Sequence, residues 1–303
     1  MSQWFRGLTE VPESLSHSLL VNKWLRRYRL WRMIALTLIM VLVIHATHKY
    51  YTSSKDHFVK LLFSGEIFDM EAVRRAGKLL DDPSVKGLLI VANSPGGMPV
   101  VSEAWHLLFN RLQQKKIPVI AITEAVCASG CYLAIMGVDK IFSYHNSILG
   151  SIGAISIAPN FYNIIKKIDI QYDIVKSGPL KGEPHPFSMP NEVYHDEVQY
   201  IVNSIGTWFQ QQVIKSRGLT AELSIQDVLK KGGIYLAEEA LKLKLIDEIS
   251  DEVMAMEYLR SVAKNSNIAF ETFNPHNHSF LSLQNWRCIL ASVQSYLPEI
   301  MLH

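Results

Sequence analysis

Residues 117–132, IPVIAITEAVCASGCY, join an apolar, β-branched run to a cluster of small residues. Residues 117–125 are almost uncharged, as expected of a strand that is buried on both faces of a sheet. The sequence GCYLAIMG that comes next predicts one or two helical turns ended by Gly137. Ser129 then lies at a helix N-terminus, where free N–H groups and the helix dipole favour negative charge on a bound oxygen. The segment therefore predicts a strand, a turn and a short helix, with a serine nucleophile at the turn.

Strand-like and helix-like segments alternate along the rest of the chain. Short β-branched runs predict strands at residues 59–67, 85–92, 117–123, 140–144, 152–157, 172–175 and 268–273. Helical spacing of apolar residues predicts helices at residues 70–80, 101–114, 161–168, 191–217, 227–231, 237–243 and 252–264. Strands that alternate with helices of these lengths predict parallel βαβ units, and hence a layered α/β domain.

Four short motifs occur at the ends of the predicted strands. In chain order they are NSPGG from residue 93, ASG-x-Y from residue 128, GSIG from residue 150 and K-S-G-x-x-K from residue 176. This set resembles the signal peptide peptidase (SppA-type, SppA/SohB-like) family of serine–lysine membrane peptidases. The sequence GIYLAEEAL from residue 233 resembles the closing motif of that family. The resemblance covers roughly residues 58–250, and the fixed order of the motifs makes it more specific than any single motif.

The resemblance implies a Clp/crotonase-like layered fold of repeated βαβ units, preceded by one N-terminal transmembrane helix. It also assigns Lys181 as the general base and Ser151 as the residue that orients the lysine by hydrogen bonding. Acyl transfer by Ser129 further requires two donors for the developing oxyanion. The N–H of Gly130 at the helix start and that of Gly97 are the natural donors, because a backbone N–H faces a substrate closely only where no side chain intervenes. Lys181 acts as a base only if an apolar pocket removes it from water.

Several alternatives to this site remain open. An exposed loop position is the commonest place for a lysine, and Lys166 and Lys176 are local competitors of Lys181, more consistent with solvated surface charges. A Ser-His-Asp triad would use His145 with Asp139 or Asp173. A catalytically silent membrane scaffold and a crotonase-type acyl-CoA enzyme share the glycine-rich architecture, although the latter are generally soluble and do not need a lysine base.

Two cysteines, Cys127 and Cys131, flank the candidate nucleophile, and the family usually has glycine at the second position. If the exported side of a membrane is oxidising, the two can pair, and their spacing does not decide the matter. The favoured interpretation is that both are small buried fillers beside the nucleophile. Cys288 lies in the C-terminal tail and carries no functional inference.

The N-terminus has the character of a membrane anchor. Five basic residues between positions 23 and 32 precede the uncharged run 33–44, and aromatic residues flank that run on both sides. A cleaved signal sequence is the competing interpretation. The charge bias predicts residues 1–29 as a cytoplasmic N-terminus and 30–51 as a transmembrane signal anchor. The peptidase domain, residues 55–273, is then periplasmic at a bacterial inner membrane, and residues 274–303 form a tail without an assigned role.

Composition limits the choice of partners. The 303 residues carry 30 basic and 28 acidic side chains without a basic stripe, so we expect no nucleic acid. The histidines lack metal-ligand spacing, so we expect no metal and no cofactor. The resemblance implies peptide substrates such as signal peptides or membrane-proximal polypeptides, contact with membrane lipid, and a homo-oligomeric ring. In such rings the serine and the lysine of one site can come from neighbouring subunits.

Overall fold

The computed structural model describes residues 24, 27–45, 56–219, 229–264 and 267–276. The chain divides into two compact units, Met1–Lys55 and Asp56–His303. The first unit contains the helix Arg27–His45, which overlaps the predicted span 30–51. Its mean hydropathy is 1.5 over 19 residues, and none of the apolar window is buried against protein. By length and composition this helix can cross a membrane.

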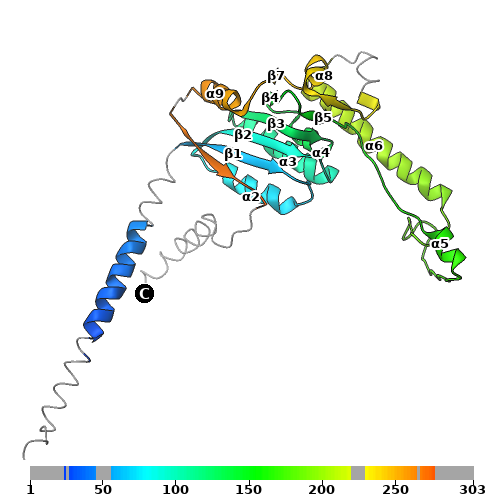
Figure 1. Ribbon diagram of the computed structural model, residues 1–303, viewed down its shortest axis with the longest axis horizontal. Helices are drawn as coiled ribbons and strands as arrows, with labels where there is room; N and C mark the ends of the chain where they lie inside the picture. The colour runs from blue at the N-terminus through cyan, green and yellow to red at the C-terminus, as the bar shows by residue number, and fades with distance from the viewer. Residues whose placement is uncertain (1–23, 25–26, 46–55, 220–228, 265–266, 277–303) are drawn as a thin grey trace, which may run out of the picture. The chain divides into compact units, whose positions relative to one another are not determined.

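The second unit is built on an eight-stranded sheet in which most strands run parallel (Figure 1). The strand order is β6-β5-β3-β2-β1-β8, and β4 and β7 lie off this path, with β4 paired to β3 and to β7. The antiparallel pair among the described strands joins β5 to β6. The strands are β1 (His57–Ser64), β2 (Val85–Ser94), β3 (Val119–Ala128), β4 (Lys140–Ser143), β5 (Ile148–Gly150), β6 (Ile234–Leu236), β7 (Glu248–Ile249) and β8 (Ala269–Phe273).

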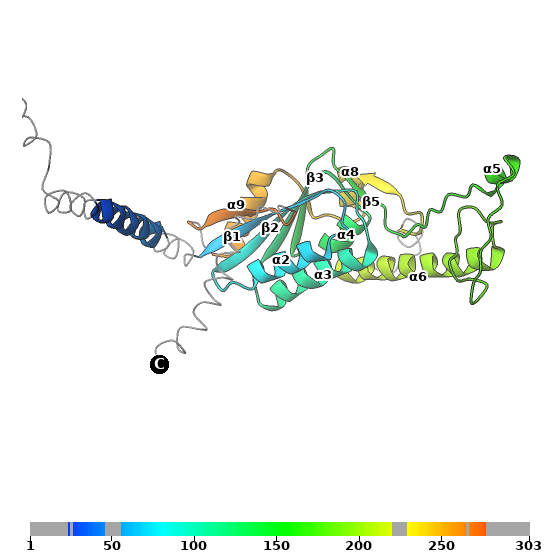
Figure 2. The same ribbon diagram turned by 90° about the horizontal axis from the view of Figure 1, so that it is seen from below.

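Helices cover both faces of this sheet (Figure 2). One face packs on α2, α3 and α4, and the other packs on α9, so the core forms two apolar clusters separated by the sheet. The helices of this unit are α2 (Met70–Leu80), α3 (Pro99–Gln114), α4 (Gly130–Ile135), α5 (Tyr162–Lys167), α6 (Glu192–Ser216), α8 (Ala237–Lys242) and α9 (Glu252–Val262). The prediction of a layered α/β fold built from βαβ units is confirmed by β1-α2-β2-α3-β3 and its parallel register.

Two predicted strands are wrong. Residues 152–157 and 172–175 form no strand, and Ile155 and Ile157 are 82% and 83% exposed. Both segments have the β-branched composition of a strand, but neither pairs with a strand of the described chain. Composition predicts a tendency, whereas a strand needs a neighbour. The helix predicted at 227–231 lies partly outside the described residues.

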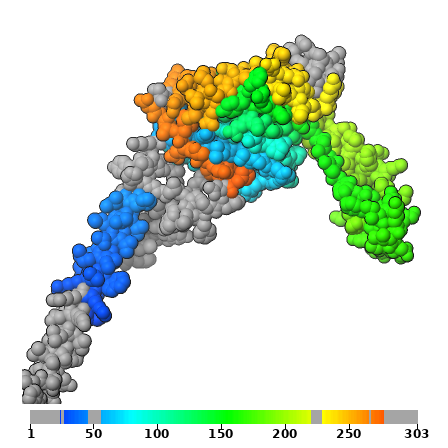
Figure 3. Space-filling view, viewed as in Figure 1, coloured from blue at the N-terminus to red at the C-terminus, as the bar shows by residue number. Residues whose placement is uncertain are grey.

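An arm, which we define as residues 154–205, extends from the sheet and contains α5 and the first part of α6 (Figures 1 and 3). Along α6 the burial changes: Phe209 and Val213 lie in the core, whereas Val193 and Tyr200 are exposed. The arm exposes a set of large apolar side chains, namely Ile155, Ile157, Ile164, Ile168, Ile170, Val175, Met189, Val193 and Ile201. Exposed apolar area of this extent on one element is typical of a contact surface.

The packing of α3 against α4 buries a titratable side chain, His106. Its Nε2 lies 2.9 Å from Asn110 Nδ2, and its Cε1 lies against Gly137, where an added Cβ would be 2.7 Å away. Burial lowers the pKa of His106, and the backbone carbonyl of Ala134 offsets this effect in part. A buried imidazole with a lowered pKa stays neutral when the same group in the unfolded chain takes up a proton.

We therefore expect acid to destabilise the protein through His106. Stability from this residue is fully present above the unfolded pKa of about 6.5 and is lost as the pH falls below it, because only the unfolded chain then binds the proton. The measurement is the unfolding temperature of wild type and of His106→Gln between about pH 7.5 and pH 5. Wild type should lose more stability than the variant over this range, and parallel curves for the two proteins would contradict the assignment.

Candidate active site

Ser129 occupies a strained turn between β3 and α4. Its backbone has φ 52° and ψ −122°, a conformation that residues with a side chain rarely adopt. Such strain costs about 1–3 kcal/mol and persists where the surrounding structure enforces it, commonly at functional sites. Here the Ser129 N–H donates to the carbonyl of Gly150 at 2.8 Å. The sequence predicted this strand–turn–helix arrangement, and β3 extends further than predicted, to the residue before Ser129.

Two glycine N–H groups lie beside this turn. Ile67 N–H donates to Gly96 O at 2.9 Å, and Met98 N–H donates to Ile67 O at 2.9 Å, so the N–H of Gly97 faces away from Ile67. On its other side lies Gly130, where an added Cβ would be 3.0 Å from Gly97 N. Neither the Gly97 N–H nor the Gly130 N–H has a hydrogen-bond partner within the described parts of the chain. Two free N–H groups beside a serine have the arrangement of an oxyanion hole.

Close packing explains why these positions are glycines. A Cβ added to Gly96 would lie 2.7 Å from Gly130 N and 2.9 Å from Ser129 Cβ, and Gly96 also has φ +107°. A Cβ added to Gly97 would overlap the backbone of Ile67. The NSPGG loop and the start of α4 therefore approach each other at backbone distance, which only glycine permits.

Ser151 lies next to Ser129 across the sheet. Ala128 pairs with Gly150 in the parallel register of β3 and β5, so the residues that follow them are neighbours. The Ser151 N–H donates to the carbonyl of Gly233 at 2.7 Å, and the residue also has positive φ, 51°. The structure thus brings four of the predicted site residues together: Ser129, Ser151, Gly97 and Gly130.

Lys181, in contrast, lies on the arm. It is exposed, its N–H donates to Gly178 O at 3.1 Å within a turn, and its side chain forms no hydrogen bond or ion pair with the described residues. Lys176 is not the solvated charge that the sequence predicted, because its ammonium pairs with the carboxylate of Glu183. Within one chain, then, the predicted base does not join the Ser129 cluster.

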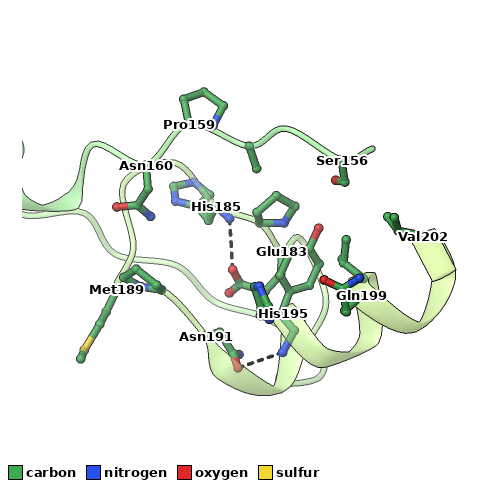
Figure 4. A pocket seen from close by; sticks show the side chains of 15 residues that line it. Ser156, Pro159, Asn160, Glu183, His185, Met189, Asn191, His195, Gln199 and Val202 are labelled. Atoms are coloured by element: carbon green, nitrogen blue, oxygen red, sulfur yellow. Dashed lines mark hydrogen bonds between the residues drawn. The ribbon is translucent and has the colours of Figure 1, made fainter. Parts of the chain in front are cut away.

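A cavity of about 310 Å³ lies on the arm, between its loops and the first turns of α6 (Figure 4). Glu183 and Asn191 on its wall accept backbone N–H groups, from His185 at 3.1 Å and from Tyr194 at 3.2 Å. The hydrogen bond from Lys176 lowers the pKa of Glu183 below its usual value, which keeps the carboxylate charged. The cavity shares no residue with the Ser129 cluster.

The residues of the alternative triad lie apart. His145 is 62% exposed, and its Nε2 is 3.9 Å from Glu238 Oε1. The carboxylate of Asp139 accepts the Val119 N–H at 2.7 Å and the Gln113 amide at 2.8 Å. Asp173 is exposed on the arm. Among the described residues no group of three or more His, Cys, Asp or Glu side chains is placed to hold a metal ion.

Cys127 and Cys131 form a disulfide across the turn that carries Ser129, with their Cα atoms 5.2 Å apart. Both side chains are fully buried, as expected from the sequence, but the favoured interpretation that they are unpaired fillers is wrong. The last residues of β3 and the first turn of α4 bring the two Cβ atoms together, and spacing in the sequence does not reveal this. The disulfide thus links the end of β3 to the first turn of α4, on either side of Ser129.

The family comparison agrees with the motifs. Residues 111–271 match the model of peptidase family S49. A putative protease of Methanocaldococcus jannaschii is 33% identical over 186 residues, which cover 61% of this chain and 59% of that protein. The putative signal peptide peptidase SppA of Enterococcus faecium is 29% identical over 204 residues, 67% of this chain and 59% of that protein. The chain thus spans about three fifths of the length of these two relatives.

Two solved structures match parts of this chain at low identity. The 1510-N membrane-bound stomatin-specific protease is 16% identical, with a TM-score of 0.47, and the match covers 73% of this chain and 98% of that chain. ClpP1 from Listeria monocytogenes is 15% identical, with a TM-score of 0.44, and the match covers 70% of this chain and 99% of that chain.

Proposed function

The chain belongs to peptidase family S49, and we propose that it is a membrane-anchored serine endopeptidase with Ser129 as its nucleophile and Lys181 as its general base. The observation that carries the proposal is the setting of Ser129. It lies on a strained turn beside two glycine N–H groups that have no hydrogen-bond partner among the described residues. Ser129 is half-buried, and the two N–H groups are the oxyanion donors that acyl transfer requires.

The reaction proceeds in two steps. Ser129 Oγ attacks the peptide carbonyl carbon while the neutral Lys181 amine takes the hydroxyl proton. The N–H groups of Gly97 and Gly130 stabilise the negative oxygen, and the C–N bond then breaks as the Lys181 ammonium returns the proton to the leaving amine. Water then attacks the acyl-enzyme while Lys181 accepts a proton from it. The bond to Ser129 Oγ breaks as the Lys181 ammonium returns the proton to that oxygen, which releases the acid and restores Ser129 and the neutral lysine.

Lys181 reaches this site from a second copy of the chain. Two observations support this part of the proposal: Lys181 is exposed on the arm, and the arm presents a long set of exposed apolar side chains. A head-to-tail contact between unlike surfaces, repeated around an axis, closes into a ring. When the arm docks on the next copy, apolar contacts exclude water around Lys181, and Ser151 beside Ser129 orients the amine.

The proposed substrates are signal peptides or other membrane-proximal polypeptides. Residues 152–157 start beside the candidate site, are exposed at Ile155 and Ile157, and have no strand partner in the described chain. Such a segment can accept an extended peptide as an added strand. The helix Arg27–His45 anchors the enzyme with its basic end in the cytoplasm, and the buried disulfide is consistent with a peptidase domain on the oxidising, exported side.

A biotinylated alkyl fluorophosphonate tests the proposal on the full chain in detergent, because this reagent phosphonylates activated serines and spares ordinary ones. We expect one adduct, on the peptide that contains Ser129, and no adduct in Ser129→Ala. Ser64→Ala, which removes an exposed serine at the end of β1, serves as the matched control and should label normally. Absence of labelling in the assembled wild type would favour the silent scaffold instead.

A further inference from the structure

Ser102 on α3 is a buried polar residue whose hydroxyl contributes to no hydrogen bond between described residues. Its side chain is 0% exposed, and its Oγ has no hydrogen-bond partner among the described residues. Buried hydroxyl groups are nearly always paired, because an unpaired one loses its hydration and gains nothing in exchange. An unpaired hydroxyl in a core position therefore lowers stability, and alanine at this position would not carry that cost.

The side chain of Ser102 lies against Gly130. A Cβ added to Gly130 would overlap Ser102 Oγ and would lie 3.3 Å from Ser102 Cβ. The same added atom would be 3.0 Å from Gly97 N, so Ser102 Oγ and Gly97 N lie on the same side of Gly130. Its own N–H donates to the carbonyl of Met98 at 3.0 Å, which fixes Ser102 to the residue directly after Gly97.

One side chain thus connects the two backbone segments of the oxyanion hole. Its backbone N–H is bonded to the segment that contains Gly97, and its hydroxyl oxygen occupies the place that a Cβ on Gly130 would need. The separation of the two N–H groups therefore depends on the size and placement of this hydroxyl.

We propose that Ser102 is a positioning residue of the oxyanion hole, which holds the Gly130 N–H at the correct distance from the Gly97 N–H. This inference rests on the proposed function. Removal of the hydroxyl leaves space behind Gly130, into which the start of α4 can shift, and small shifts of an oxyanion donor reduce transition-state stabilisation. The unpaired hydroxyl is thus retained for activity at the expense of stability.

The test is Ser102→Ala in the full-length, assembled protein. We expect kcat for a peptide substrate to fall by about tenfold to 100-fold with little change in KM, since only the transition state uses the hole. Affinity for a peptide boronate, which places a negative oxygen in the hole, should fall by a similar factor. The unfolding temperature should stay the same or rise, because an unpaired buried hydroxyl is removed.

Ser143→Ala is the matched control, since Ser143 is an equally buried serine whose hydroxyl is fully used. It accepts from Thr123 Oγ1 at 2.8 Å and donates to Tyr144 O at 3.1 Å. This variant should show the opposite pattern, with a lower unfolding temperature and an unchanged kcat. Unchanged kcat and boronate affinity in Ser102→Ala would overturn the inference.

A second measurement tests the inference if Ser102→Ala does not fold normally. An alanine at 130 overlaps Ser102 Oγ, so Gly130→Ala should lose less activity in a Ser102→Gly background than alone. If the activity losses of the two substitutions are additive, the two residues are not coupled and the inference is overturned. Failure of the proposed function is distinguishable, because then the wild type itself neither cleaves peptide nor reacts with the fluorophosphonate.

Discussion

Ser129→Ala is expected to lower kcat by at least about 10⁴-fold, because no other group can form the acyl-enzyme, while the fold stays intact. The strained backbone at residue 129 is enforced by the Gly150 carbonyl, the disulfide and the glycine loop, none of which involves the hydroxyl. The measurement is cleavage of casein and of a signal peptide by the full-length protein, together with its unfolding temperature.

His145→Ala is the control that separates the serine–lysine site from a triad. His145 is exposed on the surface and contacts Glu238, so its removal should leave kcat within about twofold of wild type. If His145→Ala were inactive while Lys181→Ala cleaved normally, the base assignment would be wrong and the triad would take its place. Equal activity of Ser129→Ala and wild type would remove Ser129 as the nucleophile.

Lys181→Ala has the second largest expected effect, a fall in kcat of about 10³-fold, because general-base assistance contributes about 10² to 10⁴. Lys166→Ala is the matched control, as Lys166 is another arm lysine, 6.0 Å from the ring of Tyr162, and should retain full activity. Lys176→Ala should instead loosen the arm by removing the ion pair with Glu183.

A mixing experiment tests where Lys181 acts. Ser129→Ala and Lys181→Ala chains are each expected to be inactive alone. If the site is shared between copies, co-expressed chains that assemble at random should contain both side chains in roughly one site in four. Separately purified and unmixed assemblies should remain inactive. If mixed assemblies show no activity, Ser129 and Lys181 belong to the same chain and the arm has another role.

Much of the fold could be predicted because the chain's local signals agree with its packing. The helix predicted at 70–80 is α2 to the residue, and the helix predicted at 191–217 is α6 within one residue at each end. Both helices have an Asp or Asn at the N-cap whose side chain accepts a backbone N–H. Capping is a local property and is visible in sequence.

The errors concern features that depend on distant neighbours. Residues 152–157 have the composition of a strand, but they pair with no strand of the described chain, and pairing depends on residues distant in the sequence. The disulfide depends on how β3 meets α4, and the contact of Ser102 with Gly130 depends on how α3 meets α4. Nothing in the spacing of these residues distinguishes them from ordinary core positions, so their roles became visible only in three dimensions.

The disulfide between Cys127 and Cys131 limits the shapes that residues 127–131 can adopt. A peptidase accepts its substrates as extended strands, and an extended chain over the same four steps would span about 13 Å between Cα atoms. The bond holds these Cα atoms at 5.2 Å, so residues 127–131 cannot be straightened. Under the proposed function, residues 127–131 of one copy therefore cannot serve as an extended substrate for another copy.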